Sequence, residues 1–178
     1  MDQIFADMFP TTQIPYPVIF ARFCGAIFFG GLIGFEREAQ DKAAGLRTHI
    51  LISLAAAVFA IISIESVHMP GLSDEQVRID PLRVVEAVTA GVAFLAAGTI
   101  VLSGGQVRGL TTGAGMWLAG AIGLALGFGH WLIAAFALVA GLTVLYAVAK
   151  IQDVWRSPQS PQPPLAVTDS NEHQNSAN

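Results

Sequence analysis

The chain has 178 residues, of which 53% are hydrophobic and only 12% are charged, and its mean hydropathy is +0.59. A soluble domain carries about 25% charged residues, so this apolar excess argues against a soluble core and predicts lipid as the solvent. The net charge of −4 is small and is not clustered, which excludes a basic surface for nucleic acid.

The N-terminal segment, residues 1–17, contains three prolines, two aspartates and no Lys or Arg. A secretory signal needs a positive n-region, so we expect the first apolar segment to be retained as a helix. Residues 1–17 are predicted to be periplasmic. Two alternatives remain for this segment: a short interfacial helix around Ile4–Phe9, or an unstructured leader.

Five apolar segments follow, each near the roughly 20 residues needed to cross a hydrocarbon core. They predict an all-α membrane protein, a five-helix transmembrane bundle over residues 18–149, with helices at 18–35, 48–64, 84–102, 113–128 and 131–149. The fourth segment is short, and a re-entrant hairpin at Gly129-His130 is the alternative. Gly104-Gly105 predict a turn. Residues 150–178 are rich in Pro, Gln, Ser and Asn and predict a disordered tail.

Lys and Arg placement predicts the orientation of the chain. With the first polar loop inside, the cytoplasmic cations are Arg37, Lys42, Arg47, Arg108, Lys150 and Arg156. Arg78 and Arg83 then lie outside. This distribution favours an N-terminus on the outer, periplasmic side of the membrane and a C-terminus in the cytoplasm.

An offset of 64 residues aligns the first helix pair with the second, so that Gly34 falls on Gly98 and Leu46 on Leu110. This similarity indicates a weak parallel repeat of helices 1–2 and 3–4. Such repeats are common in transporters, which function at the repeat interface. Helix-packing constraints alone would select the same glycines.

Small residues recur at four-residue spacing within the apolar segments. In lipid, close backbone approach supplies the dispersion that holds helices together, so these stripes predict tight packing. Packing within one chain is favoured over a homodimer, which stays an alternative. The helix-packing candidates are Gly30, Gly34, Gly98, Gly115, Ala119, Gly123 and Gly127.

Arg22 and Glu86 are the two charges inside apolar segments. A lone charge at the bilayer centre costs at least about 2.5–3.5 kcal/mol on insertion scales. We therefore expect the two side chains to pair across the first and third helices. The alternative is that each reaches the outer interface separately.

Polar residues gather at the helix ends that face the cell interior in this topology, and we name them the cap. Thr48 and Thr112 are candidate N-caps. Arg47 and Arg108 lie near positive helix N-termini, where an anion such as a carboxylate, a phosphate or a lipid headgroup would be favourable. A solvated loop that only sets topology is the alternative. The cap comprises Glu36, Arg37, Glu38, Arg47, Thr48, Arg108, Thr111 and Thr112.

No catalytic or metal-binding pattern is evident in the sequence. The four histidines are scattered, and Glu36, Glu38 and Asp41 in a basic loop are weak candidates for water-mediated Mg²⁺ binding. No nucleophile motif or phosphate-binding glycine loop appears. The single cysteine, Cys24, lies in an apolar run and is predicted to be a packing residue in the core. We therefore expect no catalytic residues, no metal site and no cofactor.

Four pieces of the chain resemble the MgtC/SapB family of bacterial inner-membrane proteins. They are GGLIGFERE at 30–38, AGLRTH at 44–49, the apolar helix 91–100 and VRGLTT at 107–112, and the resemblance covers residues 18–149. Ala93 and Ala96 stand where the family usually has glycine. Many members also carry a soluble C-terminal domain resembling the ACT fold, in place of the short tail here.

The resemblance implies a non-enzymatic protein linked to growth at low magnesium and, in pathogens, to survival inside macrophages. It also implies action by binding other membrane proteins, including the F-type ATP synthase. Older usage describes such proteins as magnesium-transport accessories. The competing hypothesis is a small ion transporter or channel whose path lies near Arg22 and Glu86, and a membrane enzyme is the third.

Overall fold

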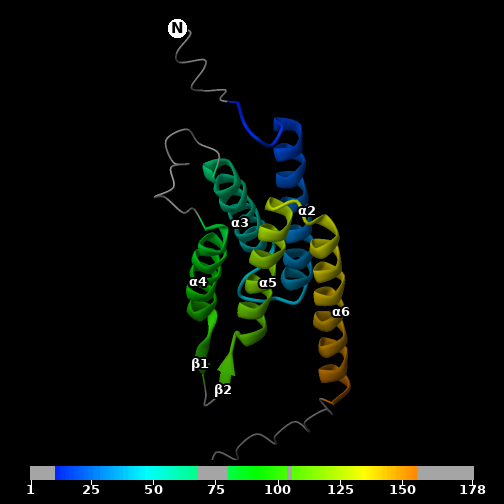
Figure 1. Ribbon diagram of the computed structural model, residues 1–178. Coiled ribbons are helices and arrows are strands. Elements are labelled where there is room, and N and C mark those ends of the chain that lie inside the picture. Colours follow the sequence, from blue (N-terminus) through cyan, green and yellow to red (C-terminus); the bar gives the residue numbers. More distant parts are fainter. Residues whose placement is uncertain (1–10, 68–79, 104–105, 156–178) are drawn as a thin grey trace, which may run out of the picture. The chain divides into compact units, whose positions relative to one another are not determined.

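The computed structural model describes residues 11–67, 80–103 and 106–155. Within these residues five helices follow in order (Figure 1): α2 (Tyr16–Ala39), α3 (Leu46–Val67), α4 (Pro81–Thr99), α5 (Leu110–Gly127) and α6 (Trp131–Trp155). By length and composition α2, α3, α4 and α5 can each cross a membrane, whereas α6 has a shorter apolar stretch, Trp131–Ala147. The predicted all-α membrane bundle is confirmed, and the fifth crossing stays a prediction.

The chain divides into two compact units, at residues 1–145 and 146–178. The first unit contains α2 to α5 and most of α6, and all the packing described below lies within it. The second unit begins inside α6, which continues to Trp155. The predicted disordered tail is therefore wrong for residues 150–155, which extend the helix. Residues 1–10 and 156–178, with the predicted leader and the rest of the tail, lie outside the described residues.

Helix α2 begins at Tyr16 although prolines flank this position. Proline is tolerated in the first turn because the N–H that it lacks would have no partner inside the helix. The helix continues past the predicted end at residue 35 and includes the polar residues up to Ala39. Glu36, Arg37 and Glu38 are thus held on a helix, which fixes the directions of their side chains.

A short hairpin replaces the predicted end of the third helix. Helix α4 ends at Thr99, and Ile100 is extended, with φ −89° and ψ 114°. The strands β1 (Val101–Ser103) and β2 (Gln106–Arg108) then pair antiparallel, with Val101 opposite Arg108. The prediction of helix to residue 102 is wrong, because consecutive β-branched residues before two glycines favour a hairpin. Residues 104–105 lie outside the described residues.

Helices α2, α3 and α5 form the core of the bundle, in mutual contact, while α4 packs on α5 and more lightly on α3. Helix α5 is the most buried candidate span and α4 the least. The largest fully buried apolar side chains are Ile33, Ile122 and Leu126. Large apolar side chains also cover the outside, including Phe94 and Phe136, as expected where lipid is the solvent.

Candidate functional site

Arg37 is the buried centre of the cap. It lies in the last turn of α2, and only 2% of its surface is exposed. Its guanidinium forms an ion pair with the carboxylate of Glu36, in which Nε donates to Oε2. Nη2 donates to Oε1 of Glu36 at 2.6 Å. Nη2 also donates to Oε1 of Gln40 at 3.3 Å, and the Gln40 amide donates to Glu36. The charge of Arg37 is therefore neutralised within one helix turn, which makes its burial tolerable.

Glu38 links the end of α2 to the start of α3. Its Oε2 accepts a hydrogen bond from the backbone N–H of Leu46 at 2.7 Å. That N–H belongs to the first turn of α3, where no carbonyl of the helix can reach it, and a carboxylate there is favoured by the helix dipole. A Cβ on Gly45 would lie 2.5 Å from the same Oε2. Glycine at this position therefore allows Glu38 to reach the helix end.

His49 lies where α2, α3 and α5 meet, and its side chain is fully buried. Its Nδ1–H donates to the carbonyl of Gly45 at 2.8 Å. A Cβ on Gly115 of α5 would lie 3.2 Å from Nε2 of His49 and 3.7 Å from Cδ of Arg37. In the described part of the chain, Nε2 of His49 and the buried hydroxyl of Ser53 have no hydrogen-bond partner. The two side chains form a polar line one helix turn long inside the bundle.

The other cap residues divide between the surface and the interior. Arg47, Arg108 and Thr111 are exposed, Thr48 is partly exposed and Thr112 is buried. Neither threonine is an N-cap. Helix α3 begins at Leu46, which places Thr48 in its first turn, and α5 begins at Leu110 with Gly109 as its N-cap.

Gly109 joins the hairpin to α5 in a conformation that favours glycine. Its φ is +89°, and a Cβ there would overlap the carbonyl of Thr99 at the end of α4. Only glycine allows this close approach without strain. The exposed side chain of Arg108, one residue earlier, is thus held next to the ends of α4 and α5.

Arg22 does not pair with Glu86 in this structure. Its Nη1 donates to the carbonyl of Gly127 at 2.7 Å, at the C-terminal end of α5. A cation is favourable there because the last carbonyls of a helix have no partner inside the helix and carry its negative dipole end. Glu86 is exposed on α4, whereas α2 makes its main contacts with α3 and α5. Arg22 is therefore a helix cap.

The predicted small-residue stripes form contacts between helices of one chain. A Cβ on Gly30 would lie 2.8 Å from the carbonyl oxygen of His49, and one on Gly34 would lie 2.7 Å from Cα of Leu46. Glycines on α5 approach α3 in the same way: a Cβ on Gly123 would overlap the carbonyl of Ser53, and one on Gly127 would lie 2.6 Å from that of Ala57. Ala119 is fully buried beside them.

Gly98 is the exception among the helix-packing candidates. It is exposed on α4, and a Cβ there would have no heavy atom within 4 Å. Its assignment as a contact glycine within the chain is wrong.

Sequence reasoning missed several polar residues that build this end and the opposite end of the bundle. Gln40 and His49 complete the cap. At the far end of α3, Glu65 accepts hydrogen bonds from the N–H groups of Gln13 and Ile14 at 2.9 and 3.0 Å. The four-residue spacing of His49 and Ser53 in an apolar helix is a signal that could have identified the buried polar line.

The contacts described above join the ends of helices to one another. Among the described residues, no group of three or more His, Cys, Asp or Glu side chains is placed to hold a metal ion. The carboxylates of Glu36 and Glu38, considered above for magnesium, are bound to Arg37 and to the Leu46 amide. The two exposed cations of the cap are Arg47 and Arg108.

Comparison with known proteins identifies similar sequences across most of the bundle. The sequence model described as the MgtC family matches residues 23–154. A protein of Escherichia coli strain K12, named "Putative magnesium transporter YhiD", is 43% identical over 94 residues, which are 53% of this chain and 43% of that protein. "Protein MgtC" of Brucella abortus strain 2308 is 39% identical over 104 residues, or 58% of this chain and 40% of that protein.

The aligned region is under half of the length of each of these relatives. No solved structure matches the chain. The residues matched by the family model include the cap and the glycine contacts, because this match runs from the first turns of α2 to the end of α6.

Proposed function

The chain belongs to the MgtC family, and on this basis we propose that it is a non-catalytic membrane regulator that binds another membrane protein through its cap during adaptation to low magnesium. We place it in the bacterial inner membrane, with the cap and the C-terminus in the cytoplasm and the N-terminus in the periplasm. The F-type ATP synthase, which the family resemblance implies, is the first candidate partner. A second copy of the chain is the alternative partner.

The observation that supports this proposal is that two exposed cations of the cap lie at the ends of regular elements. Arg47 follows the first residue of α3, whose N–H is bound by Glu38, and Arg108 ends β2 next to Gly109. Neither guanidinium has a hydrogen-bond partner in the described residues. Exposed charges of one sign at a membrane surface attract an acidic partner and set its orientation more than its affinity.

The test is a comparison of partner lists from magnesium-starved cells. Tagged protein is crosslinked in native membranes and purified, as wild type and as the double variant Arg47→Gln/Arg108→Gln. We expect the double variant to insert normally, to lose the enriched partner and to fail in low-magnesium growth. Lys42→Gln is the matched control, because Lys42 is an exposed cation in the loop before α3. A double variant that keeps its partners and complements growth would show that these cations only set topology.

Transport is the second candidate function, because the name of the Escherichia coli relative refers to a magnesium transporter. A path through the centre would have to pass where Gly30, His49 and Ser53 bring α2 and α3 into contact. The second function is tested by reconstituting purified protein in proteoliposomes. Mg²⁺ flux above that of empty vesicles would favour transport, and flux equal to that of empty vesicles would favour regulation.

A further inference from the structure

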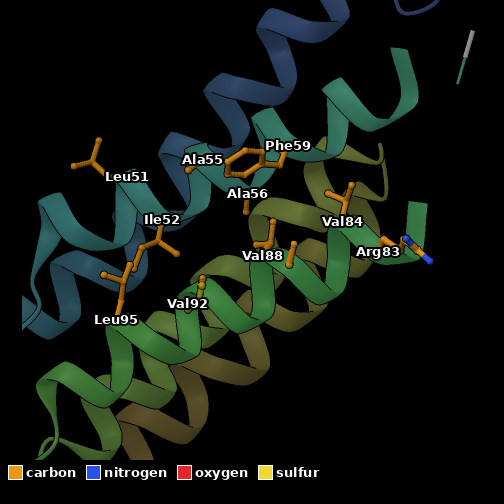
Figure 2. A pocket seen from close by; sticks show the side chains of 12 residues that line it. Leu51, Ile52, Ala55, Ala56, Phe59, Arg83, Val84, Val88, Val92 and Leu95 are labelled. Carbon is orange, nitrogen blue, oxygen red and sulfur yellow. The ribbon is translucent and has the colours of Figure 1, made fainter. Parts of the chain in front are cut away.

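An apolar groove of about 610 Å³ runs between α3 and α4. Figure 2 shows the lining side chains in a row along the two helices, with Arg83 at one end and Leu95 at the other. Among the described residues that line the groove, only Arg83 is charged. The lining residues are Leu51, Ile52, Ala55, Ala56, Phe59, Arg83, Val84, Ala87, Val88, Gly91, Val92 and Leu95.

Small residues create the space. Ala55 and Ala56 of α3 face Ala87 and Gly91 of α4, and a Cβ on Gly91 would meet no heavy atom within 4 Å. Phe59, at the edge of the groove, is 53% exposed. In a membrane, such a space between two spanning helices is not filled by water, so an apolar chain from the surroundings is its natural occupant.

The length of the groove matches one leaflet of a bilayer. From Arg83 to Leu95 there are twelve helical steps of 1.5 Å, or about 18 Å. Half of a hydrocarbon core is about 15 Å. A transmembrane helix of a partner would need a contact surface along the whole core, about 30 Å, whereas the lining residues of α3 extend only from Leu51 to Phe59. The dimensions therefore favour a lipid acyl chain over a helix.

The positive charge of Arg83 at one end of the groove is suited to binding a phosphate group. Arg83 lies in the first turn of α4 and is exposed, at the level expected for headgroups if the groove follows the acyl chains. The nearby carboxylate of Asp80 is already engaged, since it accepts a hydrogen bond from the N–H of Leu82 at 3.0 Å. Glu86 is exposed but does not line the groove. A guanidinium binds phosphate oxygens with good geometry.

We propose that the groove between α3 and α4 holds one acyl chain of a membrane glycerophospholipid whose phosphate is bound by Arg83. The site is independent of the cap and of the partner proposed above. A lipid held in this way would connect α4, the least buried candidate span, to α3.

The proposal is tested with a glycerophospholipid that carries a photoreactive group in its acyl chain. Protein in nanodiscs with phosphatidylglycerol of this kind is irradiated, and the adducts are mapped by mass spectrometry. We expect adducts concentrated on the groove residues of α3 and α4. Gly91→Phe should reduce these adducts at least fivefold, because the new side chain fills the groove. Gly98→Phe is the matched control: the same change, on the same helix, at a position that is equally open and outside the groove.

The phosphate contact is tested by native mass spectrometry of the detergent-purified protein. Arg83→Gln should lower the retained phospholipid by up to about fivefold, which is the upper limit for the loss of one exposed ion pair. Equal adducts in Gly91→Phe and Gly98→Phe, or adducts spread evenly over the lipid-facing surface, would overturn the proposal. Disulfide crosslinking between copies through Gly91→Cys would also overturn it, since a second chain would then cover the groove.

Discussion

Gly34 and Gly98 occupy equivalent places in the sequence repeat, and the structure predicts opposite effects for the same substitution. Gly34→Ala places a Cβ 2.7 Å from Cα of Leu46 and 2.9 Å from its carbonyl oxygen, where ordinary contacts are 3.4–4 Å. Both neighbours are backbone atoms of α3, which cannot turn away. The two helices must therefore separate by about 0.7 Å (3.4 minus 2.7) at this point.

Overpacking of this kind costs about 1–3 kcal/mol, and the alanine returns up to about 1 kcal/mol of helix propensity. We expect Gly34→Ala to lower the free energy of unfolding by up to about 2 kcal/mol after this propensity gain is subtracted. Gly98→Ala meets no atom within 4 Å, so only the propensity gain remains and its stability should equal or slightly exceed that of the wild type.

The assay is equilibrium unfolding of the purified protein in mixed micelles, followed by circular dichroism, with both variants measured in the same detergent. Glu38 and Arg37 lie next to the contact, so the Gly34→Ala variant should also show faster amide exchange at the start of α3. Equal unfolding free energies for the two variants would refute the close contact between α2 and α3.

Three further predictions concern the polar contacts at the helix ends. Arg22→Met should lower the unfolding free energy by about 1–2 kcal/mol, because the end of α5 loses a charged hydrogen-bond donor. In the same unfolding assay, Arg22→Lys should retain part of this stabilisation, because lysine is also a charged donor. Glu38→Ala should cost about 1 kcal/mol and speed hydrogen exchange at the Leu46 amide, and unchanged exchange would contradict the capping role. Glu65→Ala should speed exchange at the Ile14 amide and expose the residues before α2 to protease, and protection equal to that of the wild type would show that the contact is dispensable.

Hydropathy predicted the existence and order of the helices because the demand for about 20 apolar residues is local to each segment. The predicted positions of the helix ends were less accurate, because these ends depend on contacts with other elements. Helix α2 continues through Glu36, Arg37 and Glu38 because these side chains bind one another and the start of α3. Helix α4 stops early because the hairpin competes for the same residues.

Pairs between distant side chains could not be predicted from depth in the membrane alone. The cost of a lone charge in the bilayer predicts a pair between Arg22 and Glu86, but these residues lie on α2 and α4, which are not main neighbours. The acceptor for Arg22 is the backbone carbonyl of Gly127. Because every residue has a backbone carbonyl, the sequence does not single this acceptor out. Gly98 shows the same limit, since the 64-residue offset aligns it with Gly34 while its surroundings are open.

The hydrogen bond between Arg22 and Gly127 joins residues 105 positions apart. Helix α2 leaves the ribosome long before α5 exists, so the guanidinium enters the membrane ahead of its acceptor. Until α5 arrives, this charge must be solvated by headgroups or by the insertion machinery. Assembly of the bundle is thus completed late in biogenesis, and a chain truncated before α5 would keep an unneutralised arginine in its first helix.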